Sequence, residues 1–327
     1  MSTERRLPTS ADVARAAGVS RSTVSYVLNA TPGARVAEET RKRVLATADE
    51  LGYVPNMAAA DLRRGTSRII LIVIERQRAA HVITEFMSSI ADALREHGFT
   101  MLTLQVSGDV TGEDARSWAT LRPAVVFSVG TRFSADARKV FKRSKVVLIG
   151  EYDADVRWFF DQGPIAAAGA QALLERGRNG ILQILPDDPS LAEFTAPRVA
   201  AFVEATGSRG LGTVHLPLGP ALAAFVQELP TTRPECDGLV VHNDEYAALV
   251  VGALLDVGID VPSRISVIGV DNTPWGAWMR PALSTLSIVS SPFVAALAAA
   301  VVASAAGEHG SDLRLDGTIS IIHRQTT

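Results

Sequence analysis

Residues 9–29 constrain the fold of this chain most strongly, because they predict two short helices joined by a tight turn. The segment reads TSADVARAAGVSRSTVSYVLN. Thr9 with Asp12 three residues later fits an N-terminal capping box, and Gly18 can adopt the left-handed turn conformation at little steric cost. Ser20 then caps a second helix. Two helices joined in this way are a common means of placing a helix in the major groove of DNA.

The apolar residues of this segment recur at helical spacing, so each predicted helix has an inward and an outward face. The inward side chains are Val13, Ala14, Ala17, Val24, Val27 and Leu28. The second helix presents Arg21, Ser22, Ser25 and Tyr26 outward. Periodicity by itself fits a plain αα-hairpin, in which Ser and Thr only cap helices, as well as it fits a DNA-binding unit.

Charge is distributed unevenly along the 327 residues. Residues 1–68 hold 11 Lys and Arg against 7 Asp and Glu, whereas residues 69–327 hold 21 against 28. A basic N-terminal part on an acidic remainder favours a nucleic-acid contact confined to the N-terminus. The length predicts two or three domains, and 47% hydrophobic residues are ordinary for a globular protein.

The remaining chemistry-bearing residues form no pattern typical of an enzyme or a metal site. Cys236 is the single cysteine, which excludes an intrachain disulfide, and no metal-ligand spacing surrounds it. The sequence contains neither a nucleophile elbow nor a phosphate-binding loop. We therefore expect no enzymatic activity, no metal and no cofactor. Since a signal-peptide core is missing and residues 293–306 are too short to span a bilayer, we expect no membrane contact and a cytoplasmic location.

The pattern A-D-V-A-x-x-A-G-V-S-x-x-T-V-S-x-V-L-N resembles the N-terminal signature of the lactose/galactose repressor (LacI/GalR) family of bacterial transcriptional regulators. The resemblance is dense and without gaps. It implies a helix-turn-helix headpiece at residues 1–54, which reads one half of a pseudo-palindromic operator as part of a homodimer. The residues of this headpiece that we expect to contact DNA are Thr9, Ser20, Arg21, Ser22, Thr23, Ser25, Tyr26 and Asn29.

Arg21 is the residue of the headpiece best suited to read a base. An arginine can donate two parallel hydrogen bonds to O6 and N7 of guanine, and it would stand near the start of the recognition helix. In the family that the chain resembles, the positions of Arg21 and Ser22 largely set operator choice. The alternative is that Arg21 contacts phosphate only. Thr9, Ser20, Thr23, Ser25 and Asn29 are better assigned to capping and phosphate contacts, which position the protein without specifying sequence, and Tyr26 could do either.

Residues 37–67 predict a third helix followed by a short connecting segment. The third helix covers about 37–51, with Val44, Ala48 and Leu51 at helical spacing and with Ala37 at its start, where many relatives have a serine cap. Residues 55–67 are too short for an independent helix, so a linker is one interpretation. The resemblance implies instead a hinge helix that orders when two copies pair on DNA. In that interpretation Asn56, Ala59 and Leu62 contact DNA, with Leu62 as a wedge in the minor groove.

From Arg68 onward, buried apolar strands alternate with helices, which predicts an α/β domain with parallel sheets. The resemblance continues there more loosely, in GIDVPSRISVIGVD at 258–271, RPALSTL at 280–286 and IIHR at 321–324. It implies a two-lobed effector domain at 68–327, like a periplasmic sugar-binding protein. The first lobe would hold about 68–161 and 290–312, and the second lobe about 162–289 and 313–327.

Ligands of α/β lobes bind at the carboxyl ends of strands, where Asn243 and Asp271 each follow a predicted strand. Arg198 matches a helix start that the resemblance implicates, and Trp275 could stack on a ring. A carboxylate, a guanidinium and an amide would suit a sugar, polyol or nucleobase. The alternatives are a turn cap for Asp271, a surface ion pair for Arg198 and a core position for Trp275.

The first lobe departs from the family pattern. The loop after Ile74 lacks the Asn-Pro-Phe common there, and Gly150 stands where relatives often have an aspartate. The first lobe could therefore form a different pocket that uses Gln77, Arg78, His81 or Glu151, and we include Gln77 and His81 in the predicted site. The predicted effector contacts are Gln77, His81, Arg198, Asn243, Asp271 and Trp275.

The interpretation that these observations favour is a homodimeric repressor whose operator affinity is controlled by a small polar effector bound between two lobes. One alternative is a dimeric DNA-binding regulator whose body is a scaffold without a ligand. Another is a solute-binding protein, which the missing signal peptide and the intact headpiece pattern disfavour.

Overall fold

The computed structural model describes residues 8–28, 35–53, 67–75, 81–288, 291–308, 312–315 and 319–327. The chain divides into two compact units, Met1–Ser67 and Arg68–Thr327, which are described separately below. The predicted site residues that lie outside the described residues are Asn29, Asn56, Ala59, Leu62 and Gln77. His81 is described through its backbone only.

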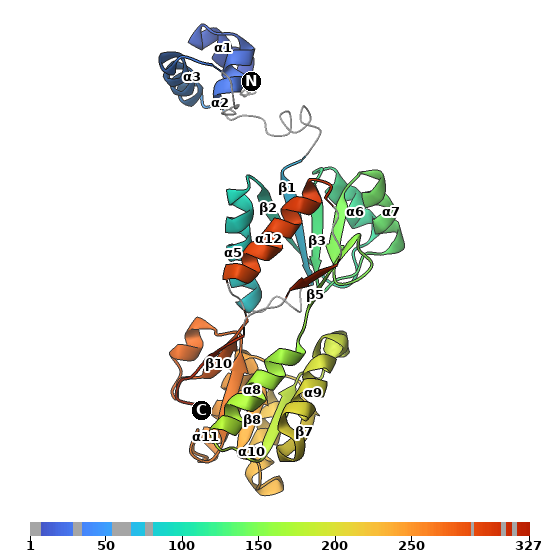
Figure 1. Ribbon diagram of the computed structural model, residues 1–327, viewed down its shortest axis with the longest axis vertical. Helices are drawn as coiled ribbons and strands as arrows, with labels where there is room; N and C mark the ends of the chain where they lie inside the picture. The colour runs from blue at the N-terminus through green and yellow to red at the C-terminus, as the bar shows by residue number, and fades with distance from the viewer. Residues whose placement is uncertain are drawn as a thin grey trace, which may run out of the picture. The chain divides into compact units, whose positions relative to one another are not determined.

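The described part of the first unit consists of helices α1 (Ser10–Ala17), α2 (Arg21–Leu28) and α3 (Glu38–Glu50), as Figure 1 shows. Their buried side chains form one small core, made of Val13, Ala14, Ala17, Val24, Val27, Val44 and Ala48. This confirms the predicted inward faces, with Leu28 partly buried against the same core. The prediction was wrong for Leu51, which is 40% exposed because α3 ends one residue before it.

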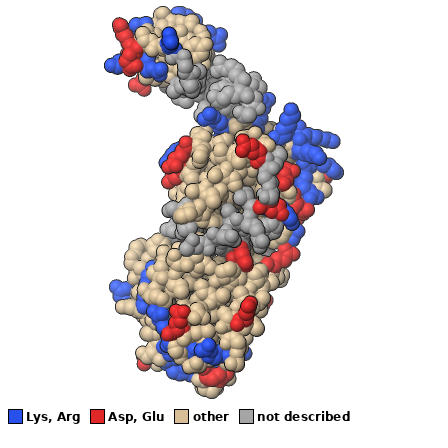
Figure 2. Space-filling model, in the orientation of Figure 1, with Lys and Arg blue, Asp and Glu red and all other residues tan. Residues whose placement is uncertain are grey.

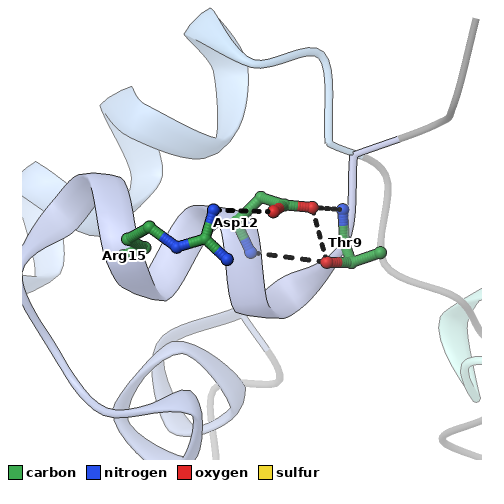
Figure 3. Close-up of polar contacts among 3 residues, drawn as sticks. All are labelled: Thr9, Asp12 and Arg15. Atoms are coloured by element: carbon green, nitrogen blue, oxygen red, sulfur yellow. Dashed lines mark hydrogen bonds and ion pairs between the residues drawn. The ribbon is translucent and has the colours of Figure 1, made fainter.

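The ends of these helices follow the local sequence. Thr9 and Asp12 form the capping box at the start of α1: the Thr9 hydroxyl accepts from the Asp12 backbone N–H, and the Asp12 carboxylate accepts from the Thr9 backbone (Figure 3). Gly18 ends α1 with φ of 66°. The α3 helix begins at Glu38, and its N-cap residue Ala37 provides no side-chain cap, as the absence of a hydroxyl there predicts.

The second unit contains two six-stranded sheets, each the centre of one lobe. The first lobe has the strand order β11-β5-β4-β3-β1-β2. Its strands are β1 (Ile69–Glu75), β2 (Thr100–Val106), β3 (Val125–Val129), β4 (Val147–Gly150), β5 (Val156–Phe160) and β11 (Leu313–Leu315). All pairings in this sheet are parallel. The inner residues of β1 are buried without alternation, because helices cover both faces of the sheet.

The second lobe has the strand order β12-β10-β9-β8-β6-β7. Its strands are β6 (Ile181–Leu185), β7 (Gly210–His215), β8 (Gly238–Val241), β9 (Ser266–Val270), β10 (Ser284–Ser287) and β12 (Ser320–Ile322). Only the pairing between β10 and β12 is antiparallel among the described strands of this sheet. The α/β prediction with parallel sheets is therefore confirmed for both lobes.

Helices cover each sheet on both faces (Figure 1). In the first lobe, α5 (His81–Glu96) and α12 (Ser291–Ala305) pack on one face, and α6 (Gly112–Ala119) and α7 (Ala135–Arg143) on the other. In the second lobe, α8 (Gly163–Glu175) and α9 (Ala192–Thr206) pack on one face. The opposite face carries α10 (Pro220–Thr232) and α11 (Asp244–Asp256).

Two features of the C-terminal segment correct the sequence analysis. Residues 313–315 form β11 beside β5, so they belong to the first lobe and not to the second as predicted. The apolar stretch at 293–306 forms most of α12, which was not predicted as a helix. Its hydrophobic residues are spread around the helix, so no amphipathic period marks it in the sequence. No helix of the described residues is long and apolar enough to cross a membrane.

Candidate nucleic-acid interface and polar site

The outward face of α2 presents polar groups at the surface of the first unit. Arg21 and Ser22 open the helix and are exposed, and Tyr26 one turn later is 45% exposed. Val24 and Val27 on the opposite side are buried in the core, so this orientation of the helix is held by packing. No carboxylate of the described residues forms an ion pair with Arg21. Its guanidinium is therefore available to an external acceptor.

The hydroxyl groups around Ser20 begin the helix. The Ser20 hydroxyl accepts from the Thr23 backbone N–H at 3.0 Å. It also lies 2.7 Å from the Ser22 hydroxyl and 2.8 Å from the Thr23 hydroxyl. This confirms the predicted cap at Ser20 and ties all three hydroxyls to one another. They are thus placed to position the helix N-terminus, which is itself suited to an anionic group.

A contact that the sequence analysis did not predict fixes α3 to α1. The Arg43 Nε donates to the Ala17 carbonyl oxygen at 3.1 Å. That carbonyl belongs to the last turn of α1, where a cation compensates the unpaired backbone acceptors. Because Gly18 and α2 follow directly, this bond also restrains the segment that delivers Arg21.

In the second unit, a buried guanidinium lies at the centre of a polar cluster. Arg198 on α9 is almost fully buried. Its Nε and Nη2 donate to the Gln162 side-chain oxygen at 3.0 and 2.8 Å, and Nη1 donates to the His242 carbonyl oxygen at 2.7 Å. Burial lowers the pKa of Arg198 to about 10, although nearby Asp271 opposes that shift, so the guanidinium stays charged at neutral pH.

His242 is a neutral partner of this guanidinium. Its Nδ1 lies 3.3 Å from Arg198 Nη1, and since a guanidinium can only donate, Nδ1 accepts. Burial, and then the charge of Arg198, hold the pKa of His242 well below its ordinary value. Gln162 and His242 are neutral, so they orient the Arg198 guanidinium without neutralising its positive charge.

Asp271 faces this cluster from the carboxyl end of β9. Burial raises the pKa of its carboxyl group to about 7, with Arg198 lowering it and Asp244 raising it. Its backbone has φ of 108°, which is strained for a residue other than glycine. Its backbone N–H donates to the Leu286 carbonyl oxygen at 2.8 Å, and its carboxylate has no hydrogen-bond partner among the described residues. A strained, partly buried carboxyl without a described hydrogen-bond partner is typical of a ligand-binding position.

A second buried carboxylate, Asp244, braces the loop that carries Asp271. It accepts from the Thr273 backbone N–H at 2.7 Å, from the Thr273 hydroxyl at 2.8 Å and from the Thr285 hydroxyl at 2.5 Å. A Cβ at Gly269 would collide with the Asp244 carboxylate, so only glycine fits that position of β9. All of these bonds are internal, which makes Asp244 a positioning residue.

Asn272 completes the brace, because its side-chain oxygen accepts from Arg324 Nη2 at 2.7 Å. Arg324 Nη1 donates in turn to the Leu283 carbonyl oxygen at 2.7 Å. The two residues that follow Asp271 in the loop after β9, Asn272 and Thr273, are thus each held by a specific partner.

The structure brings only part of the predicted effector site together. Arg198 and Asp271 interact electrostatically. Asn243 caps α11, with its side-chain oxygen accepting from the Tyr246 backbone N–H at 3.0 Å. Trp275 lies in the short 3-10 helix Pro274–Ala277 and is partly exposed. The effector contacts of Asn243, Trp275 and His81 stay predictions.

Three residues of the cluster, Gln162, His242 and Asp244, were not predicted as part of the site. His242 and Asp244 flank Asn243, which the sequence places at the carboxyl end of a predicted strand. A buried arginine needs acceptors, so the polar neighbours of Asn243 were the available signal. Gln162 precedes α8 and meets Arg198 only through the packing of α8 on α9. The described residues contain no cluster of metal-ligating side chains.

Among the described residues, one ion pair joins the two lobes. Arg132, in the loop after β3, pairs with Glu193 on α9 at 3.3 Å. The same guanidinium lies 4.0 Å from the ring centroid of Tyr152, which follows β4. Both charged side chains are roughly half exposed, so the pair is weak on its own.

Comparisons with known proteins agree with this division. Residues 9–56 match the family of bacterial regulatory proteins, lacI family, and residues 170–327 match the periplasmic binding protein-like domain. An uncharacterized HTH-type transcriptional regulator from Streptomyces limosus is 30% identical over 86% of this chain and 83% of its own length. The HTH-type transcriptional regulator GntR of Pseudomonas aeruginosa is 29% identical over 98% of this chain and 96% of its own length.

Among solved structures, a lac repressor dimer bound to operator and to the anti-inducer ONPF matches with a TM-score of 0.73 and 20% identity, over 98% of this chain and 99% of that one. At that identity the likeness concerns the fold. A helix-turn-helix unit joined to a two-lobed body of parallel sheets is the architecture of a DNA-binding transcriptional regulator. The chain belongs to the LacI family of bacterial regulatory proteins.

Proposed function

We propose that this protein is a homodimeric transcriptional repressor, and that a small polar effector bound between the lobes, at Arg198 and Asp271, controls its operator affinity. The observation that carries the proposal is the partly buried carboxyl of Asp271, which has no hydrogen-bond partner among the described residues and faces a charged guanidinium that is already oriented by Gln162 and His242. A ligand with several hydroxyl or amide groups can donate a hydrogen bond to the Asp271 carboxyl and accept one from the Arg198 guanidinium. That chemistry favours a sugar, polyol or nucleobase.

The proposal for DNA rests on α2. Arg21 donates to guanine in each half-site, and Ser22 beside it and Tyr26 contact the same DNA surface. Thr9, Ser20, Thr23, Ser25 and Asn29 position the helix on the duplex. Asn56, Ala59 and Leu62 act in a hinge at the centre of a pseudo-palindromic operator. The division into a headpiece at 1–54, a hinge at 55–67 and an effector domain at 68–327 belongs to the same proposal.

The remaining parts of the proposal follow from the class of protein. The matched lac repressor structure is a dimer on its operator, which supports a homodimer for this chain. A regulator of this kind acts on chromosomal DNA, so we place it in the cytoplasm and assign it no enzymatic activity. A change in lobe arrangement needs only a few kcal/mol of differential binding energy to switch operator occupancy.

The effector half of the proposal is tested by ligand screening. Sugars, polyols and nucleobases are screened by thermal shift against the intact protein and against Asp271→Asn. A ligand that raises the melting temperature of the wild type and not of the variant supports binding at Asp271. If no compound of these classes stabilises the wild type, the body is a dimerisation scaffold and this half of the proposal fails.

The DNA half is tested separately, by selecting duplexes from a randomised pool with the intact protein. A recovered pseudo-palindromic site supports the proposal. Recovery of unrelated sequences would contradict it whatever the ligand screen shows.

A further inference from the structure

Five cations gather at one end of the first lobe, and we call them the basic rim: Arg68, Arg122, Lys142, Arg143 and Lys145. Arg68, Arg122 and Lys145 precede β1, β3 and β4 by one to three residues. These strands are neighbours that begin in register, with Ile70 beside Val125 and Val125 beside Val147. Their first residues therefore lie side by side, at the amino end of the sheet.

Lys142 and Arg143 end α7, and α7 packs beside α6 on the same face of the sheet. In a parallel α/β unit the ends of such helices return to the edge where the strands begin. Figure 2 shows Lys and Arg gathered on the surface over α7. All five side chains of the rim belong to exposed residues. The rim stands out because residues 69–327 carry 28 acidic against 21 basic residues.

The cations of the rim are not neutralised within the described residues. Arg138 and Lys139, which lie earlier on α7, pair with Asp153 and Asp136. In contrast, no described carboxylate pairs with any member of the rim. The stretches 117–123 and 140–146, which carry four of the five cations, contain no acidic residue. Arg68 Nη1 donates to the Gly98 carbonyl oxygen at 3.4 Å, and the other four cations are exposed with no ion-pair partner among the described residues.

Two members of the rim occupy backbone positions that favour glycine. Arg122 has φ of 50° and Lys145 has φ of 57°. A left-handed residue after a helix is usually glycine, because a side chain is strained there. Cations near helix C-termini also favour the helix dipole, which is the competing explanation for this placement. That explanation predicts a stabilising role for these two side chains, and it predicts no role in binding.

We propose that the basic rim binds the phosphate backbone of DNA beside the site that α2 reads, an inference that rests on the proposed DNA-binding function. Arg68 begins the second unit, and residues 54–66 connect that unit to the headpiece. Fourteen peptide steps from Tyr53 to Ser67 reach at most about 50 Å. The connection from the headpiece therefore enters the second unit at Arg68, which is itself a member of the rim. Phosphate is the partner that a row of exposed cations selects when they have no ion-pair partner among the described residues.

The test uses the intact protein and a site recovered by random-site selection, placed in duplexes of about 20 and about 50 base pairs, the shorter covering both half-sites. The rim variant is Arg122→Gly with Lys145→Gly. The charge-matched control is Arg176→Gln with Arg209→Gln, two exposed cations of the second lobe. Dissociation constants are measured between about 50 and 200 mM salt, together with melting temperatures.

We expect the rim variant to bind the longer duplex roughly three- to tenfold more weakly than the wild type, with a shallower salt dependence. We expect its melting temperature to rise, because glycine removes the backbone strain. The control should match the wild type on both duplexes.

Unchanged affinity and salt dependence of the rim variant on both duplexes would overturn the proposal. An acidic protein would then be the better partner for the rim. A lowered melting temperature with unchanged DNA binding would overturn it in favour of helix-end stabilisation. If the wild type selects no site at all, the proposed function has failed first, so the two failures are distinguishable. Lys142→Gln with Arg143→Gln provides a second rim variant that leaves the strained positions untouched.

Discussion

The polar face of α2 and the polar cluster around Arg198 use similar groups in opposite environments. On α2, Arg21 and the neighbouring hydroxyls stand at the surface, and the core beneath them is wholly apolar. Around Arg198, the guanidinium itself, Gln162 and Asp244 are buried and held by specific partners, whereas the Asp271 carboxyl has none among the described residues. Surface groups can change without disturbing the fold, whereas a buried charge is coupled to ligand, pH and stability together. Substitutions at the two places should therefore have effects of different kinds.

The largest expected effect is on the pH dependence of stability, through Asp271. Its folded-state pKa is raised to about 7 from 3.8, so its stabilising contribution is complete below about pH 4 and is lost as the pH rises through 7. The free energy of unfolding should fall by up to about 4 kcal/mol across that range. Asp271→Asn should remove this loss, which urea denaturation at several pH values measures. The exposed Asp256→Asn is the control, and an equally steep profile in Asp271→Asn would contradict the assignment.

Asp244→Ala should be nearly as costly at neutral pH. It leaves the Thr273 and Thr285 hydroxyls and one backbone N–H without their acceptor, in a buried place. We expect a loss of about 3 kcal/mol in the free energy of unfolding. The neighbouring Glu245→Ala, at an exposed position of the same helix, should change it little. Equal effects of the two substitutions would show that the brace around Asp271 does not hold that loop.

Arg21→Ala tests the surface region of this comparison, the polar face of α2. We expect a loss of about 1–3 kcal/mol of binding energy per half-site and relaxed preference at one base pair. The melting temperature should stay unchanged, because Arg21 is exposed and outside the core. Arg15→Ala, on the outer face of α1, is the matched control. Random-site selection with both variants gives the readout, and an unaltered base preference in Arg21→Ala would assign this residue to phosphate.

The smallest expected effect is that of Glu193→Gln, which removes the ion pair between the lobes. Since both partners are partly exposed, the free energy of unfolding should change by less than about 1 kcal/mol. The pair joins two lobes whose arrangement is proposed to change when the effector binds. We therefore expect a larger relative change in the effector concentration that gives a half-maximal change in operator binding than in the free energy of unfolding. Gel-shift titration with the ligand found by screening measures it, with Glu204→Gln on the same helix as control. If the titration curves of Glu193→Gln and the wild type coincide, the ion pair has no role in the effector response.

The parts of this protein that the amino-acid sequence determined by itself are those in which neighbours along the chain are neighbours in space. The capping box of Thr9 and Asp12, the turn at Gly18 and the two faces of α2 depend on spacings of three or four residues. The apolar strands of the parallel sheets are equally local, because a strand buried on both faces must be apolar throughout. For these elements the prediction and the structure agree.

Tertiary structure alone decided the contacts between residues far apart in the chain. Arg198 was predicted as a site residue, but its partners Gln162 and His242 come from other elements. The packing of α8, α9 and β8 decides which acceptors meet the buried guanidinium. Residues 313–315 joined the first lobe because an edge strand needs a partner, and β5 provides it. Helix α12 is marked by burial against α5 and not by any period in its sequence. The unpartnered carboxyl of Asp271 is likewise visible only once Asp244, Asn272 and Arg324 are seen to hold the loop around it.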